Sequence, residues 1–306
     1  MIKQVISMGD VGVLLVGYNR PDLLTNRIHE LASANLVNLY ISIDGGELSR
    51  TTEMENFKIL VKNKLAFIPN LRINHESHNL GMVRHLTSKI TQVLSNHNYI
   101  IVIEDDVRLS KAFFPNMLNG LNYLENRKLV GVVCGWSPLP FPYIKNKWRN
   151  SKYVYLWGWA TSKYAWEGYS YDLSKENLEK NLAKSLRWSK LSNHQRASWL
   201  SKFKTIKELP LNTWDYQYLY HCIKSNHHII APLFSITGNQ GFEDERAVHT
   251  KGIKPRFIQN KLLNNRKITQ TSRFFTLIVY FFDLIYLNDS IFVSKLKSFL
   301  NKIKRL

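Results

Sequence analysis

The sequence predicts an α/β fold, in which helices flank a mostly parallel mixed sheet and a basic amphipathic helical tail follows. Strand patterns alternate with helix patterns through the first 130 residues, which indicates a parallel sheet with crossover connections. Polar residues follow several of these strands, at the edge where open α/β sheets bind ligands. Basic residues dominate the chain after residue 250.

The first strand–helix–strand unit begins close to the N-terminus. Residues 11–17 are apolar and predict a buried strand. A helix is predicted over 22–34, and the side chain of Asp22 can cap it. Residues 39–43 predict a second strand, and Asp44 opens the loop at its carboxyl end.

A third short strand is predicted at 71–74, and a helix over 81–94 follows, with Asn79 as its cap. Neither a Gly-rich dinucleotide fingerprint nor a P-loop follows the strand at 11–17. Their absence from the sequence argues against a classical dehydrogenase or a P-loop NTPase.

The most informative stretch is a buried strand over 99–103 that runs directly into Glu104-Asp105-Asp106. Charges are rarely buried unpaired, so the triplet should lie at the strand's end and face a cleft. Carboxylates without neighbouring His or Cys suit a hard cation, Mg²⁺ or Mn²⁺, that also holds substrate phosphates. The alternative is a solvated acidic turn after a core strand.

The second half of the chain contains shorter predicted elements. They are a helix within 108–128, a strand at 130–134, an extended aromatic segment at 153–160 followed by a helix from Ser162, helical sequence within 172–210, a helix over 213–224, a strand at 229–232, and a polar loop over 235–250.

The formal net charge of +19 implies an anionic partner: nucleic acid, an anionic membrane surface or a phosphorylated substrate. The two cysteines, Cys134 and Cys222, offer neither a metal-binding spacing nor a disulfide framework. The first ten residues lack the long apolar region of a signal peptide, so we expect a cytoplasmic protein.

The C-terminal tail, residues 251–306, differs from the rest in charge. It carries twelve Lys or Arg residues against two Asp. Residues 290–306 predict a helix with one apolar face and basic flanks, a pattern typical of helices that lie in a membrane interface. The alternative is an ordinary amphipathic helix that packs on the folded domain.

Four segments together resemble the GT-A fold (Rossmann-like) of nucleotide-sugar glycosyltransferases, and within it the N-acetylglucosaminyltransferase I type and bacterial surface-polysaccharide glycosyltransferases. These segments are Val16-Gly17-Tyr18-Asn19-Arg20, Ile43-Asp44-Gly45-Gly46, Asn79-Leu80-Gly81-Met82-Val83-Arg84 and Ile103-Glu104-Asp105-Asp106. The resemblance implies a catalytic domain over 1–250, with a nucleotide-sugar half over about 1–130 and an acceptor half over about 131–250.

The resemblance also implies roles for individual residues. Asp44 would bond the uracil of the donor, and Asp106 would bind the metal. Further implied contacts are Asn19, Arg20 and Arg84 near the nucleotide and its diphosphate, Glu104 and Asp105 at the ribose or donor sugar, and Trp157, Gly158 and Trp159 in the sugar and acceptor wall. The Trp-Gly-Trp segment can instead be core packing.

The same resemblance implies that Asp215 is the catalytic base of an inverting reaction. Its alternatives are Glu243 and Asp244, and Asp215 can also be an ordinary helix N-terminal residue. His249 would be a further metal ligand or, alternatively, a surface histidine.

The leading prediction is a metal-dependent inverting glycosyltransferase. It would use a UDP-sugar and a glycan or polyprenyl-pyrophosphate-linked acceptor in the synthesis of a bacterial surface polysaccharide, O-antigen or capsule. It would work on the inner face of the cell membrane, as a peripheral protein. The alternatives are a metal-dependent nucleotidyltransferase and a non-enzymatic nucleic-acid- or membrane-binding protein. No nucleic-acid partner is expected, because the sequence contains no recognisable binding module.

Overall fold

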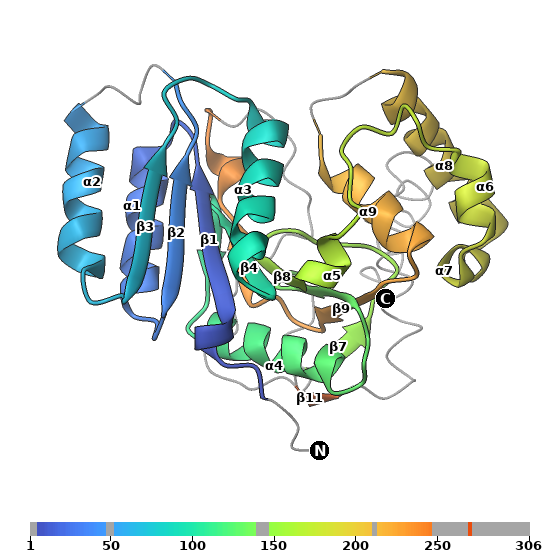
Figure 1. The fold of residues 1–306 in the computed structure, drawn as a ribbon, viewed down its shortest axis with the longest axis horizontal. Helices are drawn as coiled ribbons and strands as arrows, with labels where there is room; N and C mark the ends of the chain where they lie inside the picture. The colour runs from blue at the N-terminus through green and yellow to red at the C-terminus, as the bar shows by residue number, and fades with distance from the viewer. Residues whose placement is uncertain (1–4, 47–51, 139–146, 210–212, 247–268, 271–306) are drawn as a thin grey trace, which may run out of the picture.

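The computed structural model describes residues 5–46, 52–138, 147–209, 213–246 and 269–270. Within these ranges nine strands form one sheet, in the order β11-β7-β9-β6-β8-β4-β1-β2-β3. The predicted fold class is confirmed, because this sheet is mixed, mostly parallel in its first half, and covered by helices (Figure 1).

The first half of the sheet is entirely parallel. β1 (Val11–Gly17) lies between β2 (Asn38–Ile43) and β4 (Tyr99–Glu104), and β3 (Asn70–His75) extends the sheet beyond β2. The carboxyl ends of these strands therefore meet at one edge, at the top of Figure 1. The four predicted strands of this half are confirmed.

The second half of the sheet is mixed. β8 (Trp159–Ser162) lies antiparallel between β4 and β6 (Gly131–Cys134). β9 (His228–Pro232) runs parallel to β6, and β7 (Lys147–Asn150) runs antiparallel to β9. The short strand β11 (Thr269–Gln270) ends the sheet.

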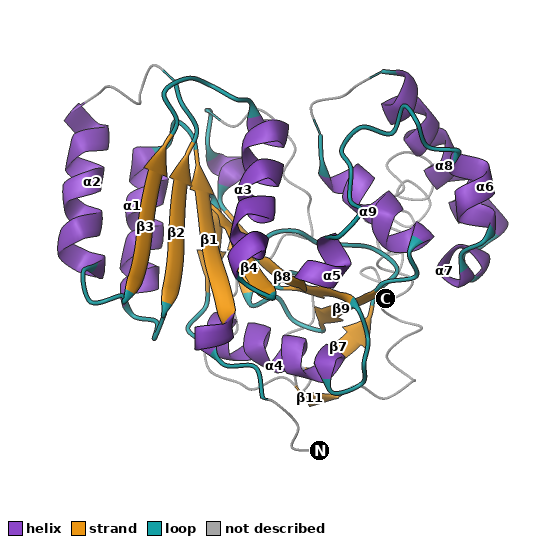
Figure 2. Cartoon of the chain, viewed as in Figure 1, coloured by secondary structure: helices purple, strands orange, loops and turns teal. Residues whose placement is uncertain are grey.

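Helices cover both faces of the sheet and create two apolar cores (Figure 2). One core contains residues from α1 (Pro21–Ala32), α2 (Thr52–Leu65) and α4 (Phe113–Glu125). The other contains residues of α3 (Met82–Asn96) and of the helices of the second half. Alternate residues of β1 point into the two cores, as the two-residue period of a strand requires.

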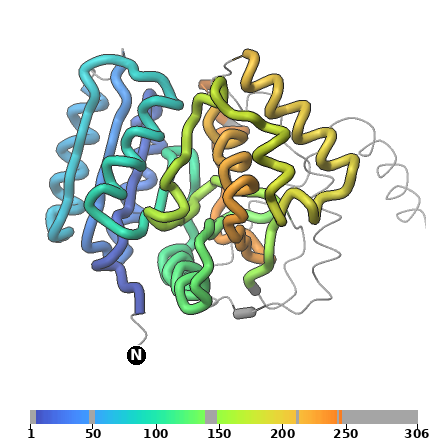
Figure 3. The backbone as a smooth tube through the Cα atoms, turned by 45° about the vertical axis from the view of Figure 1, so that its right-hand side comes forward, coloured from blue at the N-terminus to red at the C-terminus, as the bar shows by residue number. Residues whose placement is uncertain are grey.

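The second half carries a layer of short helices at the right of Figure 1. They are α5 (Lys163–Trp166), α6 (Leu178–Ala183), α7 (Leu186–Ser189), α8 (Asn193–Glu208) and α9 (Asp215–Lys224). Figure 3 shows these helices as a group beside the parallel half of the sheet. Serine or asparagine side chains cap α5, α6, α7 and α8 by accepting backbone N–H bonds.

A small second sheet lies beside the acidic segment. β5 (Val107–Leu109) pairs antiparallel with β10 (Thr237–Asn239), which joins residues about 130 positions apart. Two short 3-10 helices, η1 (Met8–Asp10) and η3 (Gly241–Glu243), complete the described elements.

Several details of the sequence-based prediction were wrong. The segment 153–160 was expected to be extended, but only its last two residues belong to a strand, β8. The polar loop predicted over 235–250 contains β10, and α2 was not predicted at all. The amphipathic helix expected over 290–306 lies outside the described residues. No helix within the described ranges is long and apolar enough to cross a membrane.

Candidate active site at the sheet edge

The acidic triplet lies at the carboxyl end of β4, as the sequence predicts. Glu104 is the last residue of this strand, and Asp105 and Asp106 form the turn into β5. Only 3% of Asp105 and 9% of Asp106 is exposed to solvent. The triplet is therefore not a freely solvated turn, and its charges need partners.

Arg20, in the loop after β1, supplies the main partner. Its guanidinium makes a bidentate ion pair with Asp105, in which Nε lies 3.2 Å from Oδ2 and Nη2 contacts Oδ1. Its Nη1 lies 3.2 Å from Oδ2 of Asp106. One cation thus bridges two carboxylates, and Arg20 and the triplet form a single buried cluster.

Burial and mutual repulsion alter the acidity of the three carboxyls. Burial raises the pKa of Asp105 to about 6, although the neighbouring Arg20 charge opposes this rise. Burial also raises the pKa of Glu104 well above its usual range, and the charges of Asp106 and Asp105 raise it further. The pKa of Asp106 is raised by burial too, again against the effect of Arg20. Perturbed carboxyls gathered in one place are typical of functional sites.

A second arginine, Arg27 on α1, supports the acidic turn from beneath. It is 2% exposed and donates to the carbonyl oxygen of Val107 and, at 3.2 Å, to Oε1 of Gln240. The backbone N–H of Gln240 in turn donates to the carbonyl oxygen of Asp106 at 2.8 Å. Arg27 was not among the predicted site residues. Its burial is indicated in the sequence only by its place three residues after Leu24, on the apolar face of a predicted helix.

Asp44 connects two loops of the same edge. Its Oδ1 accepts hydrogen bonds from the backbone N–H of Gly45 at 3.0 Å and of Leu80 at 2.8 Å. Asn79, beside Leu80, donates to the hydroxyl of Tyr18 at 3.0 Å. The loops after β1, after β2 and before α3 therefore meet, as expected for parallel strands.

The other residues assigned to the donor differ in position. Asn19 is half-buried beside Arg20 in the loop after β1. Arg84 lies on the first turn of α3 and is exposed. Arg20 contacts carboxylates in this structure, whereas Arg84 forms no ion pair with a carboxylate of the described residues.

Asp215 is the first residue of α9, and the hydroxyl of Thr213 donates to its Oδ1. The charge of Asp215 contributes to raising the pKa of Glu104, which lies more than a hundred residues earlier in the chain. Asp244 pairs with Arg246 at 2.8 Å instead. Glu243 falls in η3, and His249 lies outside the described residues.

The Trp-Gly-Trp segment divides between surface and core. Trp157 is partly exposed and packs edge-on against Trp136, with ring centroids 4.5 Å apart. Trp159 is 0% exposed and stacks on Trp214, which precedes Asp215. Its burial favours the core-packing alternative for Trp159. Gly158 has φ +67°, and an added Cβ there would lie 2.8 Å from Thr237.

The described residues contain no group of three or more His, Cys, Asp or Glu side chains that could hold a metal ion by themselves. This fits the chemistry of Mg²⁺, which proteins commonly bind through one or two carboxylates together with substrate phosphates. Asp106 fits such a site, because its carboxylate is the more exposed of the two aspartates in the turn and contacts Arg20 through one nitrogen only, at 3.2 Å.

No protein-family model and no curated protein matches the chain. Solved structures with low overall similarity include UDP-glucose pyrophosphorylase in complex with UDP-glucose, with 10% identity and a TM-score of 0.37 over 74% of this chain and 91% of that one. The inositol-1-phosphate CTP transferase of T. maritima has 10% identity and a TM-score of 0.36, over 74% of this chain and 86% of that one.

A third structure, the 4-diphosphocytidyl-2C-methyl-D-erythritol synthase of Anaerococcus prevotii, has 12% identity and a TM-score of 0.34, over 64% of this chain and 84% of that one. TM-scores this low carry no argument about the reaction of this chain, so the reaction must be argued from its own residues.

Proposed function

We propose that this protein is a metal-dependent inverting glycosyltransferase that uses a UDP-sugar donor. The observation that carries the proposal is the buried acidic turn at the carboxyl end of β4, bridged by Arg20 and influenced by the charge of Asp215. Paired carboxylates at this edge of an α/β sheet suit a diphosphate held through a divalent cation.

In this proposal each group has a separate task. Asp106 would hold the cation, and Asp44 and Asn19 would contact the nucleotide. A bound Mg²⁺ or Mn²⁺ would offset the negative charge that develops on the departing diphosphate. Arg20 already neutralises part of the charge of the turn, and it lies where a phosphate group would need a cation.

Asp215 would act as the general base. Inversion requires a carboxylate on the acceptor side that takes the proton of the attacking hydroxyl while the sugar–diphosphate bond breaks. The hydroxyl of Thr213 donates to Asp215 and fixes its orientation. The position of Asp215 at the start of α9 also places its charge at the favourable end of the helix dipole.

Nucleotidyl transfer is the second candidate, because the named structures belong to that class. It would require cations that cradle a nucleoside triphosphate. In this chain the loop after β1 is Tyr18-Asn19-Arg20-Pro21, with neither a Gly-rich run nor a lysine, and its one arginine is paired with Asp105. We therefore rank sugar transfer first.

Calorimetric titration of UDP, with and without Mn²⁺, tests the donor site. We expect binding that requires the metal and that Asp106→Asn removes, since the amide keeps the shape but loses the charge. Glu55→Gln, an exposed carboxylate on α2, is the matched control and should bind as the parent does. Metal-independent binding, or binding retained by Asp106→Asn, would contradict the metal assignment.

The products distinguish the two candidate reactions. Incubated with a UDP-sugar, a glycosyltransferase releases UDP when it transfers the sugar. This transfer is slow when the sugar goes to water and faster when it goes to an acceptor. Incubated with a UDP-sugar and pyrophosphate, a nucleotidyltransferase forms UTP and a sugar 1-phosphate. UTP formation at a rate above UDP release would establish the second candidate.

The acceptor class and the location are further parts of the proposal. A polyprenyl-pyrophosphate-linked glycan would suit a basic tail, because each Lys or Arg near an anionic membrane contributes about 1 kcal/mol to binding. Co-sedimentation with phosphatidylglycerol vesicles should be strong for the full chain and weak for a chain that lacks residues 290–306. Equal sedimentation would contradict a tail-mediated peripheral location.

A further inference from the structure

A cavity of about 440 Å³ lies at the junction of the two halves, between the start of α3, the end of α8 and the start of α9. We call it the Gln217 pocket. Its polar lining consists of Arg84, Tyr171, Asp172, Ser174, Lys207 and Gln217. Its apolar lining includes Leu80 and Ile206. The pocket therefore combines polar and apolar lining residues, as ligand sites usually do.

The Gln217 pocket is adjacent to the residues assigned to the donor and shares one of them, Arg84. Asn19, Arg20, Asp44 and the acidic triplet do not line it. Leu80, which does, is hydrogen-bonded to Asp44 through its backbone N–H. Most lining residues come from the acceptor half, so a molecule in the pocket would lie beside a bound donor without replacing it.

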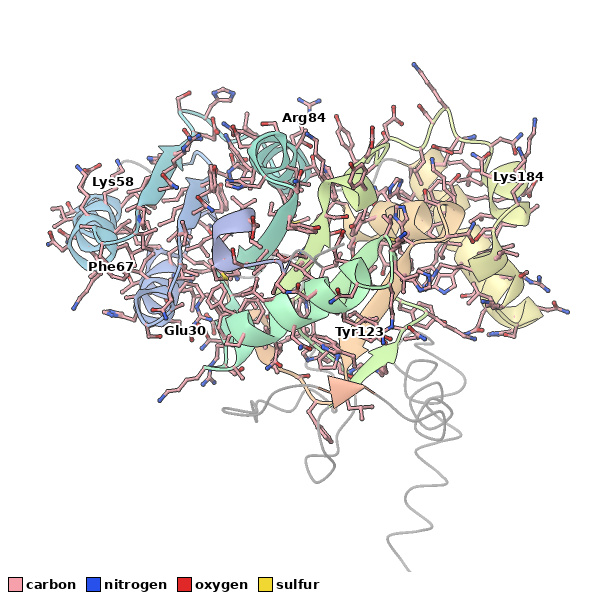
Figure 4. The ribbon with its side chains drawn as sticks, turned by 60° about the horizontal axis from the view of Figure 1, so that its bottom comes forward. Glu30, Lys58, Phe67, Arg84, Tyr123 and Lys184 are labelled. Carbon is pink, nitrogen blue, oxygen red and sulfur yellow. The ribbon has the colours of Figure 1, made fainter. Side chains whose placement is uncertain are left out.

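The charge of the pocket favours an anion. Arg84 and Lys207 contribute two positive charges against one carboxylate, Asp172. Lys207 donates one hydrogen bond to the carbonyl oxygen of Glu176 at 2.7 Å and keeps two further N–H donors. Figure 4 shows the Arg84 side chain extending from α3 away from the sheet.

The N-terminus of α3 adds to this preference. Gly81 is its N-cap, and no side chain caps the first turn of this 15-residue helix. The first N–H groups of a helix carry partial positive charge and bind anions when they remain uncapped. Gly81 itself lines the pocket, so these groups lie at its wall.

An independent observation points to a ligand that also carries hydroxyl groups. Gln217 is 2% exposed, and its Nε2 donates to the carbonyl oxygen of Thr213 at 2.6 Å. Its Oε1 is buried without a hydrogen-bond partner. A buried acceptor left unpaired is destabilising, and a small rotation toward the pocket would let a ligand hydroxyl donate to it.

Gln217 also connects the pocket to the proposed base. Its partner Thr213 donates through its hydroxyl to Asp215, so one residue positions both side chains. Thr213 therefore joins Gln217, in the wall of the pocket, to Asp215, which does not line the pocket.

We propose that the Gln217 pocket is the acceptor site, and that the acceptor is a saccharide that carries a phosphate group. The phosphate lies at the start of α3, between Arg84 and Lys207, and a sugar hydroxyl donates to Gln217. This inference rests on the proposed glycosyl transfer, and it adds the acceptor's chemical class.

Titration of glucose 1-phosphate and of glucose into the full chain tests the pocket, with UDP and Mn²⁺ present at saturation so that the donor site is filled. We expect glucose 1-phosphate to bind at least tenfold more tightly than glucose. Lys207→Gln should weaken glucose 1-phosphate at least fivefold and leave UDP affinity within twofold. Lys184→Gln, which changes an exposed lysine outside the pocket, should alter neither.

Gln217→Leu separates the two contacts. It should weaken glucose and glucose 1-phosphate by similar factors, whereas Lys207→Gln affects only the phosphate. Thermal unfolding of both variants checks that they fold. Lys207 is only half-buried, so its variant keeps the test valid if the Gln217 variant does not fold.

Each failure has a distinct meaning. If UDP does not bind, the proposed function fails. If UDP binds and the two sugars bind equally, the acceptor inference alone is overturned. If Lys207→Gln weakens UDP instead of glucose 1-phosphate, the pocket accommodates the donor's diphosphate, and the acceptor inference is again overturned.

Discussion

The carboxyls and the histidines with the largest pKa shifts lie in different halves of the molecule, although the first half also buries His85. The half before residue 130 buries carboxyls, and burial raises the pKa of Asp105 to about 6 and that of Glu104 well above its usual range. The half after it buries histidines, and burial lowers the pKa of both His221 and His227 to about 4. Both shifts have the same cause, which is that a low-dielectric interior disfavours the charged form.

The consequence for stability has opposite sign in the two halves. A carboxyl with a raised pKa binds its proton more readily in the folded state, so its contribution to stability falls as the pH rises from about 4 toward 6. A histidine with a lowered pKa must stay neutral to remain buried, so its contribution is lost as the pH falls from 6.5 toward 4. Lowering the pH therefore removes a destabilising contribution of the buried carboxyls in the first half. In the second half it removes the stability that depends on neutral histidines.

The largest expected effect separates binding by the first half from catalysis by the second. Asp215→Asn should lower the rate of sugar transfer by about 10³-fold, because loss of a general base removes 10²–10⁴-fold. UDP affinity should change little, since within the described residues Asp215 is hydrogen-bonded to Thr213 and to no donor residue. Steady-state kinetics with calorimetry of UDP measures both. A loss of UDP binding equal to the loss of rate would contradict the assignment of donor binding to the first half and of catalysis to the second.

The next prediction compares two tryptophans of the second half. Trp159→Ala should lower the free energy of unfolding by about 3–5 kcal/mol, because it leaves a cavity among Trp166, Trp214 and Tyr218. Trp157→Ala should have a clearly smaller effect, since that side chain is only partly buried. Urea denaturation followed by circular dichroism measures the difference, and equal effects would refute the assignment of Trp159 to the core.

A third prediction concerns the pH dependence of stability that the two buried histidines cause. Between pH 6.5 and 4 the two histidines should remove about 2 kcal/mol each from the free energy of unfolding. The variant His221→Gln/His227→Gln should unfold with a flatter pH dependence, even if it is less stable at pH 7. Denaturation midpoints at half-unit pH steps provide the measurement, and an unchanged slope would show that these histidines do not control acid sensitivity.

The smallest expected effect is at the surface. Arg246 pairs with Asp22 and Asp244, each at 2.8 Å, but its side chain is 42% exposed. Exposed ion pairs are worth about 0–1 kcal/mol, so Arg246→Ala should shift the midpoint only slightly. A loss above 2 kcal/mol would mean that this contact between α1 and the end of the described chain matters more to folding than exposed ion pairs do.

The halves also differ in how much of them the sequence predicts. In the first half β1, β2 and β4 are mostly apolar runs, so these strands and the meeting of the loops after β1 and β2 follow from the pattern. In the second half the strands have only two to five residues, and β8 enters the sheet antiparallel between β4 and β6. Such long-range pairing leaves no local periodicity to detect.

The residues of the candidate site also differ, between the two halves, in how far the sequence predicts them. The triplet and Arg20 were predicted as site residues, but their direct ion pair was not, because a strand ending does not specify the partner of each carboxylate. Gln217 was missed altogether. A glutamine within a helical pattern gives no sign of being buried, and only the packing of α9 against the rest of the second half reveals it.

The pairing of β5 with β10 has a consequence for shortened forms of the gene product. Thr237–Asn239 covers the backbone of Val107–Leu109, and Gln240 binds both Asp106 and Arg27. A premature stop codon after β9 would keep every proposed catalytic residue and yet remove this support. It should therefore inactivate the protein as fully as a stop codon within α9, and genetic complementation would put nonsense alleles in α9 and after β9 in one phenotypic class.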